Sequence, residues 1–186
     1  MHASLQRVLD AMATVPAYVR DSRMDVVADN ALARELQSPV YRFAQHTSTA
    51  PNSARYAFLD PSARDYYPDW EQVTHDCVAA LHGAAGHNPY DKPLSDLVGE
   101  LSTRSETFRT VWATHDVRLH RTGIKRLRHP EVGVLALEYD VMELVQQPGL
   151  VFIAYSAAPG TPDADGLALL ASMAASRSHA ATAPGA

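Results

Sequence analysis

The sequence predicts an α+β domain with a mixed or antiparallel sheet of about five strands and helices packed on one face. Short runs typical of β-strands occur near the start of the chain and again after residue 116. The segment between them has apolar residues at helical spacing. Neither group of strands makes a complete sheet alone, so we expect the N-terminal hairpin to pair with the C-terminal strands.

The bulk composition is that of one globular domain. The chain has 186 residues, 46% hydrophobic and 20% charged, enough to bury a substantial core. Its net charge of −5 argues against direct nucleic-acid binding, which needs clustered Lys and Arg. One basic run falls on the predicted strands, where a solvated sheet face is the ordinary explanation and a partner surface the alternative. Its members are Arg118, His120, Arg121, Lys125, Arg126, Arg128 and His129.

A helix and a hairpin are predicted at the start of the chain. Apolar residues recur at helical spacing from Leu5 to Met12, and Pro16 ends this helix. Two strand-like runs, 17–20 and 24–28, flank a polar tight turn, which is typical of a hairpin.

Helices should follow from residue 30 onward. Asn30 can cap the first, and the polar stretch 38–55, broken by two prolines, predicts a loop. Helical turns are expected on both sides of Asp60-Pro61, and Asp69 can cap a clearer helix with one apolar stripe.

The helix that begins after Asp69 should end at Gly83 and Gly86. Apolar residues at helical spacing over 94–101 predict another helix. Thr103 and Glu106 have the spacing of a capping box, so a further helix is expected after them.

The C-terminal part alternates as strands do. The expected strands are 117–119, 124–128, 132–139 and 150–155, with turns at 122–123 and 129–130. The last strand is apolar throughout, which is typical of a central strand covered on both faces.

Three parts of the chain are expected. Residues 1–15 form an N-terminal helix and linker, 16–170 the main domain, and 171–186 a disordered tail into which a helix over 167–173 frays. The sheet and its helices should form a cup whose apolar lining suits a small ligand.

Cysteine content and hydropathy predict a cytoplasmic protein with no membrane contact. Cys77 is the single cysteine, so no internal disulfide forms, and burial as an inert thiol is expected for it. No apolar stretch approaches the ~20 residues of a membrane span, and the N-terminus lacks a secretory signal.

Enzyme motifs are largely missing, and we expect no catalytic residue, metal ligand or cofactor. Two dipeptides, His75-Asp76 and His115-Asp116, raise the alternative of an HD-type metal-dependent phosphohydrolase. Such enzymes are helical bundles, whereas residues 116–156 have the pattern of strands. A C-terminal helix cap is the simpler role for His115.

Several segments, taken in order, resemble a known family. They are Phe58-Leu59-Asp60-Pro61 with Arg64, then Trp70, the run 97–102, Phe108 with Trp112, and His129-Pro130-Glu131-Val132-Gly133. Together they resemble the MmyB-like ligand-binding domain of XRE-type (helix-turn-helix) transcription regulators, over roughly Pro16 to Leu170. His82 departs from the pattern, since arginine is expected there.

The resemblance implies a PAS-like fold and a pocket for a fatty acid or similar lipid-like molecule. It also implies a cytoplasmic transcription regulator that acts as a homodimer and binds DNA through an N-terminal helix-turn-helix domain. Met1 falls almost at the start of the sensor domain, so the helix-turn-helix is expected to be absent from this chain. The chain is then either a fragment or a stand-alone sensor.

Nine side chains are predicted to bind the ligand. The tail is expected against Phe58, Trp112, Leu135, Leu137, Phe152 and Tyr155, although plain core packing is the alternative for each. For a carboxylate headgroup Arg55 is the first choice, followed by Arg64 and His129. A dimerisation module with a filled core and no ligand remains a further alternative.

Overall fold

The computed structural model describes residues 3–114 and 122–182. Within these ranges the elements follow the expected order of hairpin, helices and further strands. The helices are α1 (Ala3–Ala11), α2 (Ala31–Leu36), α3 (Ser38–Thr47), α4 (Ser53–Leu59), α5 (Ala63–Tyr66), α6 (Trp70–His87), α7 (Lys92–Arg104), α8 (Glu106–Ala113) and α9 (Pro162–Thr182). The strands are β1 (Ala17–Arg20), β2 (Val26–Asp29), β3 (Thr122–His129), β4 (Gly133–Glu143) and β5 (Val151–Ser156).

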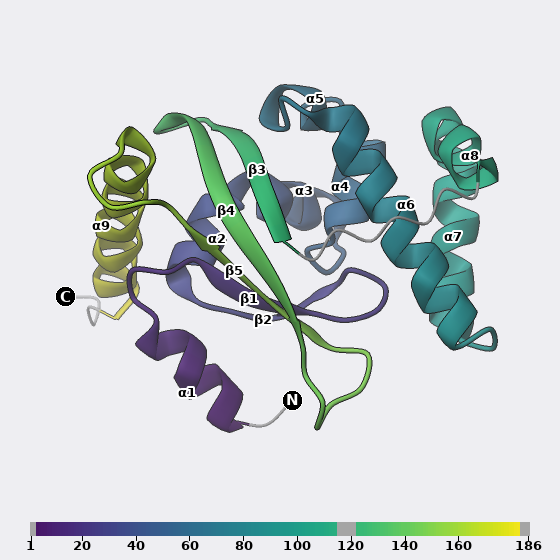
Figure 1. Cartoon of the computed structure of the whole chain (residues 1–186), viewed down its shortest axis with the longest axis horizontal. Coiled ribbons are helices and arrows are strands. Elements are labelled where there is room, and N and C mark those ends of the chain that lie inside the picture. The colour runs from purple at the N-terminus through teal and green to yellow at the C-terminus, as the bar shows by residue number, and fades with distance from the viewer. Residues whose placement is uncertain (1–2, 115–121, 183–186) are drawn as a thin grey trace.

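The strands form one antiparallel sheet in the order β2-β1-β5-β4-β3 (Figure 1). Ala17 lies opposite Ala154, and Tyr18 opposite Ile153. The predicted pairing of the N-terminal hairpin with the C-terminal strands is therefore confirmed. Because β5 is central and covered on both faces, its sequence is apolar along most of its length.

The two faces of the sheet are covered differently. Tyr18, Leu137 and Tyr155 belong to the main core, to which each of the helices α2 to α9 also contributes buried residues. The opposite face of β1 and β5 packs against Leu9 of α1 in a second, smaller cluster. In Figure 1, α1 lies apart from α3 to α8, on the other side of the strands. Helices thus cover mainly one face, as predicted, with α1 as an addition on the other.

The stretch 38–55 is not the loop that its polarity and prolines predict. Residues 38–47 form α3, with a proline in its first turn. At that position the backbone N–H has no intrahelical acceptor, so proline starts a helix instead of breaking it.

Four smaller predictions are wrong in detail. Thr122 and Gly123 lie within β3 and form no turn, and α6 continues past Gly83 and Gly86 to His87. Ser105, not Thr103, caps α8, since its hydroxyl accepts from the Phe108 N–H at 3.2 Å. Asp69 does occupy the N-cap position of α6, but its side chain makes no capping hydrogen bond, because the carboxylate accepts from Arg126 instead. The expected strand over 117–119 falls outside the described residues.

The C-terminal segment is helical up to Thr182, where disorder was expected from residue 171. Leu170 and Ala174 of α9 are buried, and α9 packs along α2. Arg177 forms an ion pair with Glu35 of α2 at 2.7 Å. A Cβ at Gly166 would lie 2.6 Å from Leu135 Cδ2, so this glycine allows α9 to approach β4 closely. The alanine-rich sequence, read as unstructured, is well suited to helix packing.

Candidate functional site

A cavity of about 100 Å³ lies between the inner face of the sheet and the helices. Strand residues alternate between faces, so the register places their inward side chains side by side. The described sheet residues that line it are Tyr18, Arg20, Lys125, Leu127, Tyr139, Val141, Ile153 and Tyr155. From the helices and turns come Met24, Gln37, Ser53, Tyr66, Tyr67, Val73, Asp76, Cys77 and Ala80. We call this space the tyrosine cavity.

Buried phenols give the tyrosine cavity its character. The rings of Tyr66 and Tyr67 are 4.7 Å apart, and Tyr155 lies 6.4 Å from both Tyr18 and Tyr139. Burial raises the pKa of each of these five phenols above its ordinary value. The phenols are therefore neutral near pH 7 and offer hydroxyl groups beside apolar rings.

Two cationic side chains and one carboxylate face the same space among the described lining residues. Arg20 ends β1, and its Nε is buried without a hydrogen-bond partner. Burial lowers the pKa of Lys125, whose Nζ lies 5.4 Å from the centre of the Tyr67 ring. Asp76 accepts a hydrogen bond from Gln72 at 2.9 Å. Burial raises the pKa of Cys77 to about 11, so this thiol stays protonated, as expected of an inert buried cysteine.

A second cavity, of about 210 Å³, lies next to α9. We call it the alanine cavity because its wall is mostly small and apolar. It is lined by Thr14, Val15, Tyr155, Ser156, Ala157, Ala164, Leu167, Ala168 and Ala171. Tyr155 lines both cavities, so they are neighbours, and the charged side chains line only the tyrosine cavity.

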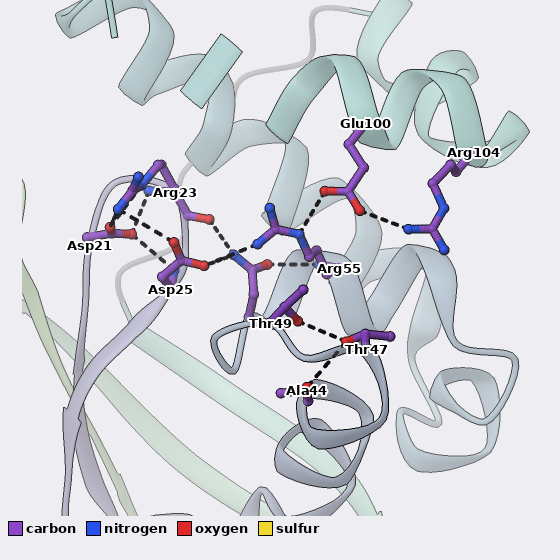
Figure 2. A network of polar contacts seen from close by, with 10 residues as sticks. Asp21, Arg23, Asp25, Ala44, Thr47, Thr49, Arg55, Glu100 and Arg104 are labelled. Carbon is purple, nitrogen blue, oxygen red and sulfur yellow. Dashed lines mark hydrogen bonds and ion pairs between the residues drawn. The ribbon is translucent and has the colours of Figure 1, made fainter. Parts of the chain in front are cut away.

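Of the nine predicted ligand residues, all of which the structure describes, Tyr155 lines these cavities and the other eight do not. Arg55 is occupied by acidic neighbours (Figure 2). Its Nε donates to Glu100 of α7 at 2.8 Å, and its Nη1 donates to Asp25 at 3.4 Å. Asn52 also donates to Asp25, at 2.7 Å. Arg55 therefore ties the hairpin turn to α4 and α7 instead of facing the cavity.

Phe58, Arg64 and Trp112 lie in aromatic contacts on the helical side. Phe58 meets Phe108 edge-to-face at 5.0 Å, and Trp112 stacks on His82 at 3.6 Å. The guanidinium of Arg64 lies 3.9 Å from the centre of the Trp70 ring. These contacts join α4 to α8, α8 to α6 and α5 to α6. For Phe58 and Trp112 this is the core packing that was given as the alternative to ligand binding.

His129 is buried and fully engaged with backbone. Its Nε2 donates to the Glu35 carbonyl at 3.0 Å, and its Nδ1 accepts from the Glu131 N–H at 3.2 Å. Leu135 and Leu137 are buried in the main hydrophobic core. Phe152 lies on the opposite face of the sheet, in the smaller cluster beneath α1. Burial lowers the pKa of His129, and its role is to hold the β3–β4 turn against α2.

Sequence reasoning missed Arg20, Lys125 and the paired tyrosines. A period of two places Tyr18 and Arg20 on one face of β1, and Lys125 on the same face as Leu127. The alternation along each strand could be read from the sequence. Which face of the strand lines a cavity depends on the helices that cover it, and the sequence pattern does not give these. Of the basic run, Lys125 and His129 turn inward and Arg126 and Arg128 are exposed, while Arg118, His120 and Arg121 fall outside the described residues.

The alternative of an HD-type metal-dependent phosphohydrolase requires a cluster of metal ligands. In the part of the chain that the structure describes, no three His, Cys, Asp or Glu side chains come together to hold a metal ion. His75 is exposed while Asp76 faces the cavity, and His115-Asp116 lies outside the described residues. Nor does any described helix have the length and apolarity needed to cross a bilayer.

An α+β sheet with cavities beside its covering helices is an architecture that suits small-molecule binding. The chain belongs to the family of MmyB-like transcription regulator ligand binding domains, whose family model matches residues 1–170. The match includes α1, which the sequence analysis placed outside the ligand-binding domain. A comparison with curated proteins finds no match. Membership identifies the chain as a ligand-binding domain of the transcription-regulator type.

Proposed function

We propose that this chain senses a lipid-like small molecule, with a fatty acid as the leading case, and catalyses no reaction. The observation that carries the proposal is the pair of cavities that share Tyr155. One has cationic and hydroxyl groups, and the other has an apolar wall. An amphiphile with a polar head and an oily tail matches that division.

The volumes of the two cavities determine whether a side chain must move before a ligand can fit. A cavity of ~150 Å³ is known to take a ligand as small as benzene, and typical ligand pockets measure ~300–1,000 Å³. Neither cavity reaches that range alone, but together they come near its lower end. A chain-like ligand would therefore join them by turning the Tyr155 ring aside.

The tail should decide affinity. About nine tail carbons contribute roughly 7 kcal/mol at ~0.8 kcal/mol each. One charge-assisted hydrogen bond to the head adds about 1.5–3 kcal/mol, against association costs of ~4–15 kcal/mol. The apolar wall thus supplies most of the binding energy and the polar chamber fixes orientation.

The proposed output is a population shift in a homodimeric regulator. The alanine cavity is bounded by α9 and by Thr14 and Val15, which connect α1 to β1. A ligand that favours one placement of α9 and α1 would change contacts between protomers, and through them a helix-turn-helix domain that binds DNA. The sheet order β2-β1-β5-β4-β3 is in keeping with the PAS-like fold proposed for such sensors.

Lipid extraction tests the proposal directly. We expect organic extracts of the purified chain to contain a lipid-like molecule by mass spectrometry, or added decanoate to raise the melting temperature. Sedimentation with and without decanoate should reveal a dimer whose stability changes. If no lipid is extracted and long-chain acids leave the melting temperature unchanged, the chain is instead a dimerisation module with a filled core.

A further inference from the structure

Arg20 occupies a particular position on the sheet. It is the last residue of β1 and lies opposite Val151 of β5 and Val26 of β2. Strand alternation puts its side chain on the same face as Tyr18, toward the helices. The guanidinium is thereby held at the wall of the tyrosine cavity.

The Arg20 guanidinium lacks the partners that other arginines of the chain have. Its Nε is buried and makes no hydrogen bond, and no carboxylate pairs with it within 3–114 and 122–182. By contrast, Arg23 and Arg55, which also lie near the hairpin turn, each contact two carboxylates. A buried donor without an acceptor destabilises the fold, and guanidinium cannot relieve this by losing its proton.

The surroundings of Arg20 favour a negative group. Lys125 is a second cationic side chain on the same wall, and Asp76 is the single carboxylate among the lining residues that the structure describes. The neighbouring phenols are neutral hydroxyls that can donate to an acid. Among the described residues, Arg20 therefore lines a chamber with two cations and one carboxylate, and its buried Nε has no acceptor there.

We infer that Arg20 is the residue that binds the acid group of the ligand, so that this sensor selects a carboxylic acid over a neutral molecule of the same shape. The inference rests on the proposed function and specifies its ligand class. The planar fork of a guanidinium matches the two oxygens of a carboxylate. The tail of the acid would then pass Tyr155 into the alanine cavity.

Calorimetric titration with two matched probes, decanoate and 1-decanol, tests the inference on the full chain at pH 7.5. The wild-type chain should bind the acid about tenfold to hundredfold more tightly than the alcohol, as one charge-assisted hydrogen bond implies. Arg20→Met should reduce this preference to roughly threefold or less without weakening 1-decanol, and Arg20→Lys should retain part of it.

The matched control is Arg128→Met, which removes a strand arginine exposed on the opposite face and should leave the preference intact. Equal affinity of the wild type for both probes, or an undiminished preference in Arg20→Met, would overturn the inference while the proposed function stands. Failure of both probes to bind the wild type would overturn both. The wild-type comparison does not depend on any variant folding, and melting curves verify that the variants fold.

Discussion

At the scale of single residues, hydrogen bonding fixes the protonation state of His129. The Nε2–H is committed to the Glu35 carbonyl and the Nδ1 lone pair to the Glu131 N–H, so the ring is neutral. A proton on Nδ1 would face another donor. Burial lowers the pKa of His129 below its ordinary value, whereas in the unfolded chain the group titrates near ~6.5.

The pH dependence of stability follows from that difference. Because the unfolded chain binds the proton more readily, the stabilisation by neutral His129 is complete above the unfolded pKa. It is lost as pH falls from there toward the lower folded pKa. We expect the free energy of unfolding to fall more steeply between pH 7 and pH 5 in the wild type than in His129→Gln. Urea denaturation at several pH values measures this, with exposed His87→Gln as control. Parallel curves for the wild type and His129→Gln would contradict the assignment.

At the scale of elements, Arg55 joins three segments that are distant in sequence. Its contacts to Asp25 and Glu100 connect the hairpin turn, α4 and α7 (Figure 2). Asp25 retains Arg23 and Asn52, and Glu100 retains Arg104, so removal of Arg55 leaves neither carboxylate unpaired. The cost is therefore below that of breaking an isolated buried pair.

Arg55→Met should lower the free energy of unfolding by about 1–3 kcal/mol, discounted for partial exposure. Chemical denaturation measures the change, and a double-mutant cycle with Glu100→Gln isolates the coupling. Arg104→Met, which removes an exposed pair within one helix, should cost about 0.5 kcal/mol or less. The acid preference should survive in Arg55→Met. Loss of that preference at unchanged stability would restore Arg55 as the headgroup residue.

The alanine cavity gives a prediction that belongs to α9. Ala164 is half-buried and lines this cavity, so Ala164→Leu places three extra carbons where the ligand tail is proposed to lie. Displacing about three methylenes should weaken decanoate roughly fiftyfold while leaving hexanoate nearly unchanged. Calorimetry with both acids measures the ratio. Ala175→Leu, on an exposed position of α9, is the control. Equal weakening of both acids would argue against a tail site beneath α9.

Elements with a clear local signal could be predicted from the sequence. Asn30 caps α2 as expected, with its Oδ1 accepting from the Ala33 N–H at 2.8 Å, and α4 and α5 flank the Asp60-Pro61 break. The wrong predictions occur where proline or glycine, which often ends a helix or forms a turn, lies inside a helix or a strand instead. Pro39 starts a helix instead of ending one, and Gly123 lies in a strand where its missing Cβ admits the Tyr139 ring.

At the scale of the whole molecule, the cavity is made by contacts that no local pattern contains. Arg20, Asp76 and Lys125 come from β1, α6 and β3 and line one cavity. Periodicity predicts which side chains share a face of one strand, but it does not predict which helix covers that face. The family-like motifs were therefore recognisable, but Trp112 and Arg64 lie in contacts between helices and do not line either cavity.

The smaller core beneath α1 decides whether the first fifteen residues belong to the domain. Leu9 is fully buried against β1, β2 and β5, while its neighbour Val8 is 54% exposed. Leu9→Ala should cost about 2–5 kcal/mol, and Val8→Ala should change stability by about 0.5 kcal/mol or less. At roughly 2–4 °C per kcal/mol, the melting temperature of Leu9→Ala should fall by about 4–20 °C.

That pair of variants also tests whether the far side of the sheet is coupled to the site. Residues 14 and 15 lie in the short link between α1 and β1 and form part of the wall of the alanine cavity. If α1 positions this wall, Leu9→Ala should weaken decanoate more than it weakens hexanoate, because the longer tail reaches further into that cavity. Calorimetry below the melting transition measures both. A variant that is destabilised but binds both acids as the wild type does would show that α1 supports the fold without shaping the ligand site.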